Sequence, residues 1–233
     1  MQEPKRKRSR ADEIYDDLRR MIVSLEFPPR AALVEKDLCA RFGTSRTPVR
    51  EAILRLADQG LVEVAPQHGT FVAGIDPRAV RQAHFLRETL EIRVISRLCE
   101  LDAPDLSGPA AAIEAQRQIS NSNDYGAFLP LDDAFHAALF ALVDMAEIWG
   151  VIHGRKAHLD RIRFLQAAPR PARLNELVRH HEAILDAIRQ RAAVAAEEML
   201  RLHVSGAVGF MERMLVEQPE LFHPSHDRPA LPV

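Results

Sequence analysis

The chain has 233 residues, of which 47% are hydrophobic and 27% are charged, and its formal net charge at pH 7 is −2. This composition is typical of a soluble globular protein with one large or two ordinary domains. No apolar run approaches the roughly 18 residues of a membrane span, so we expect no membrane segment and a cytoplasmic location. The two cysteines, Cys39 and Cys99, have no CxxC partner, which favours small buried residues over a disulfide or a metal site.

The N-terminal third begins with a basic arm, residues 1–10, that we expect to be disordered. Apolar residues at helical spacing then predict three helices, over residues 11–26, 35–42 and 46–59. The FPPR sequence ends the first helix, because each proline disfavours a helical residue before it. Ser45 is a good N-cap for the third helix, which Gly60 ends.

Two short alternating stretches, LVEVAP and TFVAG, come next and predict a β-hairpin that turns at Gly69. Together with the three helices, this hairpin predicts a winged helix-turn-helix domain over residues 11–76. From there on the pattern is helical, so we expect an all-helical bundle of about six helices over residues 77–218 and an irregular, proline-rich tail over 219–233. The predicted fold is mainly α: an N-terminal winged helix-turn-helix with a small β-hairpin, plus an all-α C-terminal helical bundle.

The third helix has a polar side that suits DNA. Its inward residues are predicted to be Val49, Ile53, Leu54 and Leu56. Arg46, Thr47 and Arg50 then share the opposite side at its N-terminal end, where a recognition helix offers side chains to the major groove. Lys36 is placed to bind phosphate, and His68 with Gly69 at the hairpin tip to approach the DNA backbone or minor groove. For any single arginine, a solvated helix charge is the alternative.

The stretch LVEKDLCARFGTSRTPVREAILRLADQGLVEVAPQHGTFVAG resembles the DNA-binding domain of the GntR family of bacterial transcriptional regulators. The matching segments are SRTPVREAI (45–53), RLADQGLV (55–62) and GTFV (69–72). The resemblance implies these DNA-contacting residues: Lys36, Arg46, Thr47, Arg50, His68 and Gly69. Two departures stand out. PPRAAL replaces the usual Pro-Gly turn, and Lys36 stands where an arginine that could bind bidentately is common.

Histidines lie inside apolar helical stripes of the C-terminal half. Residues 172–216 predict a helical hairpin that turns near residue 192, with His181 on the stripe of one arm and His203 on that of the other. Both histidines are 11 residues from the turn, about 16 Å along each helix. They would therefore lie at the same level of an antiparallel pair, facing one interior.

A third stripe, within residues 124–143, carries Asp132 and His136 inward together, while Asp133 points elsewhere and is predicted to be a surface charge. Because buried charges are normally paired or bound to metal, one carboxylate and three histidines predict a divalent metal site for Zn²⁺, Ni²⁺, Mn²⁺ or Fe²⁺. Hydrogen-bonded core histidines are one alternative. An acid/base pair is the other, but the sequence offers no partnered nucleophile, HExxH motif or Gly-rich phosphate loop.

The same half resembles the all-helical FCD effector domain of the FadR-type branch of the GntR family. The matching segments are LRETLEIR (86–93), DDAFH (132–136), HEAILDAI (181–188) and MLRLH (199–203). The resemblance implies Asp132, His136, His181 and His203 as metal ligands, and a small organic acid whose carboxylate the metal helps to hold. Arg87 matches an arginine that lines the effector pocket, with a helix-surface ion pair to Glu91 as the alternative. The segment VDMAEIWG departs from the family pattern, so no pocket contact is expected from it.

These features predict a homodimeric transcriptional regulator, not an enzyme. It would bind a short palindromic operator, with one recognition helix per half-site, and effector binding would relieve repression. Two rivals stay open. In one, the metal itself is the signal. In the other, the bundle is a metalloenzyme fused to a DNA-binding domain.

Overall fold

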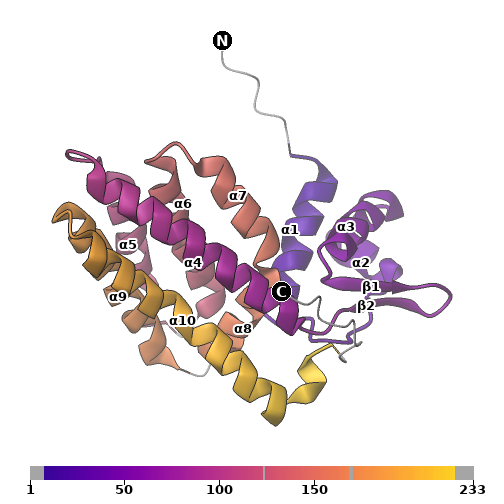
Figure 1. Cartoon of the computed structure of the whole chain (residues 1–233). Helices are drawn as coiled ribbons and strands as arrows, with labels where there is room; N and C mark the ends of the chain where they lie inside the picture. The colour runs from indigo at the N-terminus through magenta and orange to yellow at the C-terminus, as the bar shows by residue number, and fades with distance from the viewer. Residues whose placement is uncertain (1–7, 123, 168–169, 224–233) are drawn as a thin grey trace, which may run out of the picture. The chain divides into compact units, whose positions relative to one another are not determined.

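The computed structural model describes residues 8–122, 124–167 and 170–223 (Figure 1). Residues 1–7 of the predicted basic arm and residues 224–233 of the predicted tail lie outside the described residues. The chain divides into two compact units: unit 1 comprises residues 1–77 and 214–233, and unit 2 comprises residues 78–213. The predicted fold class, mainly α with a small hairpin, is confirmed.

Unit 1 contains a winged helix-turn-helix. Its elements are α1 (Arg10–Val23), α2 (Glu35–Phe42), α3 (Arg46–Asp58), β1 (Val62–Ala65) and β2 (Gly69–Val72). The strands pair antiparallel, from Val62 opposite Val72 to Ala65 opposite Gly69. Ser9 caps α1: its hydroxyl accepts from the Asp12 N–H and the Asp12 carboxylate accepts from the Ser9 N–H.

The core of unit 1 is formed by the apolar faces of α1 and α3. Val49, Ala52, Ile53 and Leu56 are the buried residues of α3. The prediction for Leu54 is wrong, because its side chain is 59% exposed. Successive helical residues are rotated by about 100°, so Leu54 cannot share the inner face that Val49, Ile53 and Leu56 occupy.

Residues 219–223 pack within unit 1. A short 3₁₀ helix, Pro219–Leu221, precedes Phe222, which forms a parallel bridge with Ile75. The Ile75 N–H donates to the Leu221 carbonyl at 2.9 Å, and the His223 N–H donates to the Ile75 carbonyl at 3.0 Å. The first residues of the predicted irregular tail are therefore ordered, because these backbone bonds and the burial of Phe222 stabilise them.

The regular elements of unit 2 are all helices among its described residues. Its helices are α4 (Pro77–Glu100), α5 (Ser107–Ile119), α6 (Tyr125–Ala141), α7 (Ala146–Arg155), α8 (Ala157–Ala167), α9 (Pro171–Arg189) and α10 (Ala193–Glu217), of which α4 starts and α10 ends in unit 1. Helices α7 and α8 are separated by a break at Lys156, whose buried ammonium group binds Asp133 and Asp160. Helical periodicity continues across such a break, so the sequence pattern does not reveal it.

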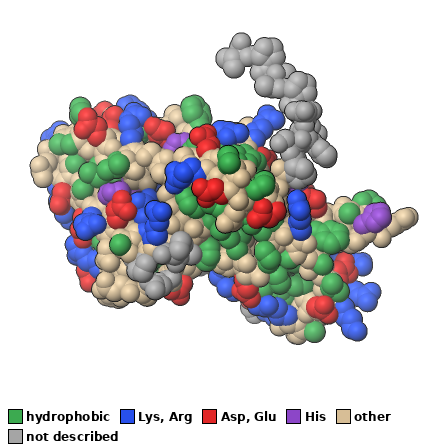
Figure 2. All heavy atoms as spheres, turned by 90° about the horizontal axis from the view of Figure 1, so that it is seen from below, with side chains coloured by type: hydrophobic (Ala, Val, Ile, Leu, Met, Phe, Trp, Pro, Cys, Tyr) green, Lys and Arg blue, Asp and Glu red, His purple; other side chains and the backbone are tan. Residues whose placement is uncertain are grey.

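Helix α6 contacts α5, α7, α8 and α9, which makes it the central helix of unit 2 and explains why Asp132 and His136 are fully buried. On the face drawn in Figure 2, basic and acidic side chains are interspersed. Within the described residues, no helix is long and apolar enough to cross a membrane.

Candidate functional site

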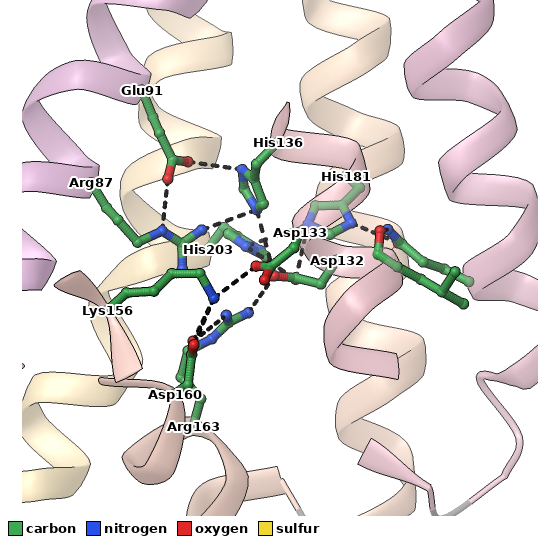
Figure 3. Close-up of polar contacts among 12 residues, drawn as sticks. Arg87, Glu91, Asp132, Asp133, His136, Lys156, Asp160, Arg163, His181 and His203 are labelled. Atoms are coloured by element: carbon green, nitrogen blue, oxygen red, sulfur yellow. Dashed lines mark hydrogen bonds and ion pairs between the residues drawn. The ribbon is translucent and has the colours of Figure 1, made fainter. Parts of the chain in front are cut away.

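Four buried side chains meet at the centre of unit 2 (Figure 3). Asp132 and His136 lie one turn apart on α6, His181 comes from α9 and His203 from α10. One ligand atom from each residue lies within 4.8 Å of all the others. The Nε2 atoms of His181 and His203 are 3.3 Å apart, and they lie 3.5 and 3.9 Å from Asp132 Oδ1. The structure therefore brings together all four residues that the sequence predicts as metal ligands.

Two of the imidazoles are oriented by polar partners on the side away from the centre. His136 Nδ1 lies 2.8 Å from Glu91 Oε2 on α4, and His181 Nδ1 lies 2.7 Å from the amide oxygen of Gln116 on α5. Since both acceptors bind the Nδ1 side, they direct the Nε2 atoms toward Asp132. This carboxylate–imidazole and amide–imidazole arrangement is typical of histidines that bind metal ions.

Burial and charge set the protonation states of the cluster. Burial lowers the pKa of His181 to about 3 and holds the pKa of His203 well below its ordinary value, which keeps both imidazoles neutral. Burial alone would raise the pKa of Asp132, but the positive charge of Arg163 is the largest of the opposing effects, and that pKa is held well below its ordinary value. An ionised carboxylate and neutral imidazoles are the forms that bind a metal ion.

Two arginines border the cluster. Arg163 on α8 donates to Asp132 Oδ2 at 2.7 Å, while Oδ1 of the same carboxylate accepts no hydrogen bond from the described residues. Arg87 on α4 donates from Nε to Glu91 Oε1 at 2.7 Å, and its Nη2 lies 3.1 Å from His136 Nε2. The Arg87–Glu91 pair is buried, so the helix-surface alternative for it is wrong. A guanidinium only donates hydrogen bonds, so His136 Nε2 uses its lone pair on Arg87 Nη2. To bind a metal ion through Nε2, His136 must give up this contact with Arg87.

Asp133 does not join the cluster, but the prediction that it is a surface charge is wrong. Its side chain is 15% exposed and its carboxylate lies 2.9 Å from the Lys156 ammonium group. The same ammonium group donates to both oxygens of Asp160. Because α7 and α8 separate at Lys156, this lysine enters the interior and carries a counter-charge to Asp133.

A pocket adjoins the cluster. Its lining includes His203 and the three arginines Arg87, Arg163 and Arg173, together with Tyr125. Arg87, the residue predicted to contact an effector, therefore faces both the pocket and the cluster. Three cationic side chains on one small pocket favour an anionic ligand.

The six predicted DNA-contacting residues are all exposed in unit 1. Arg46, Thr47 and Arg50 occupy the first turns of α3, and Lys36 lies in the first turn of α2. His68 and Gly69 lie at the turn between β1 and β2, where Gly69 has a φ of 118° that favours glycine. Arg50 Nε donates to Glu35 Oε1 at 2.8 Å, an exposed ion pair that DNA phosphates or bases can replace.

Sequence reasoning missed several residues of the site. They are Glu91, Gln116, Tyr125, Arg163, Gln166 and Arg173. None of them belongs to a metal-ligand motif. Each occupies a polar position that would also suit a helix surface, or meets its partner only across two helices. The sequence shows only whether each residue lies on the same helical face as the apolar stripe. That position does not identify the residue it meets on another helix.

Comparisons with known proteins agree with the two units. The family model "Bacterial regulatory proteins, gntR family" matches residues 10–72, and the FCD domain model matches residues 82–206. An HTH-type transcriptional regulator in an unstable DNA locus of Streptomyces ambofaciens is 37% identical over 231 residues, covering 97% of this chain and 94% of that protein. The HTH-type transcriptional repressor RspR of Escherichia coli is 32% identical over 193 residues, covering 82% and 84%. The solved structure of E. coli McbR/YncC has the same fold, with a TM-score of 0.75 at 22% identity, covering 89% of this chain and 99% of that one.

Proposed function

Since the chain belongs to the GntR family of bacterial regulatory proteins and carries an FCD domain, it is a DNA-binding transcriptional regulator, and we propose that it is a repressor controlled by a metal-assisted small organic acid. The observation that carries the proposal is the unbonded, buried Asp132 Oδ1 facing the Nε2 atoms of His181 and His203. Relatives named as repressors support the direction of control.

DNA recognition is proposed for the start of α3. Arg46, Thr47 and Arg50 are exposed at its N-terminal end, where the positive end of the helix dipole favours phosphate. Lys36, His68 and Gly69 would contact the DNA backbone on either side of the groove that α3 enters. As a homodimer, the protein would present two such helices to a palindromic operator.

The test of this assignment is Arg50→Ala, measured on a site selected from random double-stranded DNA. We expect binding to that site to weaken by about ten- to hundred-fold, the size of one lost bidentate base contact, with a smaller loss on unrelated DNA. Arg20→Ala is the matched control, because Arg20 is an exposed, ion-paired arginine on α1. Undiminished specific binding by the Arg50 variant would overturn the assignment of α3.

The spacing of the candidate ligand atoms suits a divalent metal ion. Ligand atoms about 2.0–2.2 Å from one ion lie about 3–3.5 Å from each other, close to the 3.3–3.9 Å that separate Asp132 Oδ1 and the Nε2 atoms of His181 and His203. Asp132, His136, His181 and His203 would hold Zn²⁺, Ni²⁺, Mn²⁺ or Fe²⁺. The bound ion would supply a Lewis-acid centre for a carboxylate ligand.

Elemental analysis of three proteins tests the metal site. We expect wild type to retain metal, His181→Ala to lose most of it, and His180→Ala to match wild type. His180 is a sharp control because it neighbours His181 on α9 but lies outside the cluster. Equal metal content in wild type and His181→Ala would exclude His181 as a ligand.

The effector is proposed to bind in the pocket beside the cluster, with its carboxylate at Arg87 and Arg163. Regulation requires the acid to bind the DNA-incompetent state more tightly than the DNA-competent one. The test measures release of the selected DNA site from metal-loaded and metal-stripped protein as small carboxylates are added. Release by acid in the loaded protein alone supports the proposal. Release by metal without acid would instead identify a metal sensor.

A further inference from the structure

The pocket beside the cluster has two levels, set by two helices. On α8, Arg163 and Gln166 are three residues apart, as are His203 and Gly206 on α10. Gln166 Nε2 donates to the Gly206 carbonyl at 3.2 Å, so the second members of both pairs meet at one level. Three helical residues rise about 4.5 Å. The pocket therefore has an inner level at Arg163 and His203 and an outer level at Gln166 and Gly206.

The outer level contains a cation and a space kept open by glycine. Arg173 on α9 pairs through Nη1 with Glu176 at 2.8 Å, while its Nη2 faces Gly206. A Cβ at Gly206 would lie 3.2 Å from Gln166 Nε2 and 3.5 Å from Arg173 Nη2. A neighbouring hollow is lined by Gln166, Arg170, Arg173 and Glu176, which carry two positive charges and one negative. The outer level is therefore suited to an anion.

The inner level has an excess of positive charge only when a metal ion is bound. Seven charged side chains in the described part of unit 2 are buried, four cations and three anions: Arg87, Lys156, Arg161 and Arg163 with Glu91, Asp132 and Asp160. An eighth, the 15% exposed Asp133, pairs with Lys156. These side chains balance one another among the described residues. A divalent ion would add two positive charges in a buried site, which favours a ligand with more than one negative charge.

We propose that the effector is a dicarboxylate with about four or five carbons, one carboxylate lying at the inner level beside Arg163 and the metal and the other bound by Arg173 and Gln166. This inference rests on the proposed function and adds its ligand class. Three or four C–C bonds between the carboxyl carbons span about 4–5 Å, which matches the separation of the levels. Arg173 is then the residue that selects diacids over monoacids.

The experiment compares succinate and glutarate with butyrate, which has succinate's carbon count and one carboxylate. Binding to the full chain, loaded with the metal found by elemental analysis, is measured by calorimetry at constant ionic strength. We expect succinate or glutarate to bind about ten-fold or more tightly than butyrate, as one added charge-assisted hydrogen-bonding partner would give. In Arg173→Gln this preference should fall to about two-fold or less, with butyrate binding unchanged.

Two further variants keep the test decisive. Arg179→Gln, an exposed arginine on α9 outside the pocket, should retain the full preference. Gly206→Ala should reduce it while Arg173 keeps its charge, because the added methyl group crowds Gln166 Nε2 at 3.2 Å and contacts Arg173 Nη2 at 3.5 Å. Equal binding of diacid and monoacid to wild type, or an undiminished preference in both Arg173→Gln and Gly206→Ala, overturns the dicarboxylate inference. Failure of every acid to bind the metal-loaded protein overturns the proposed function instead.

Discussion

Replacing Arg163 by methionine removes the cation that balances a fully buried carboxylate. Asp132 is 0% exposed, and Arg163 donates to it at 2.7 Å from a side chain that is 9% exposed. Breaking a buried ion pair from one side costs about 3–5 kcal/mol, because the remaining charge stays buried without its partner. Burial keeps His181 neutral at pH 7, with a pKa of about 3, so this imidazole does not supply the missing charge. We expect metal-stripped Arg163→Met to lose about 3 kcal/mol or more.

Urea unfolding followed by tryptophan fluorescence measures this loss in unit 2. Trp149, the one tryptophan of the chain, lies in α7 and its ring stacks on His136. Adding metal should restore much of the stability, since the ion supplies positive charge at Asp132. The double variant Asp132→Asn with Arg163→Met should be more stable than Arg163→Met alone when metal is absent, because no buried charge is left unpaired. A metal-stripped Arg163→Met protein within about 0.5 kcal/mol of wild type would refute this reasoning.

Three other outcomes follow from the contacts. Gly74→Ala should destabilise unit 1 and speed hydrogen exchange at the His223 amide, since the new Cβ would lie 2.5 Å from the His223 nitrogen. The backbone N–H and hydroxyl of Ser9, together with Arg55, lower the pKa of Asp12 to about 2. The ionised carboxylate therefore stabilises the fold fully above about pH 4, and this stabilisation disappears as pH falls to 2. Unfolding followed by circular dichroism should depend less on acid pH in Asp12→Asn than in wild type. Metal added to stripped wild type should change Trp149 fluorescence, and an unchanged spectrum would contradict the cluster as the binding site.

Much of the arrangement followed from helical periodicity in the sequence. Asp132 and His136 share a stripe of α6, and His181 and His203 lie at matched levels of the α9–α10 hairpin, so their convergence was predictable from spacing alone. The winged helix-turn-helix was equally readable, because caps, turn glycines and strand alternation are local signals.

The tertiary structure decided which residues complete the site. Gln116 reaches His181 across 65 positions of the sequence, and Arg163 reaches Asp132 across 31. The break at Lys156 turned Asp133 from an expected surface charge into a partner of the buried Lys156, with 15% of its side chain exposed. Periodicity indicates which side of a helix is buried, but the packing of helices distant in the sequence determines what each buried polar atom meets. The sequence thus determined the four candidate ligands and pointed to Arg87, while packing alone supplied Arg163, Arg173 and the acceptors that surround them.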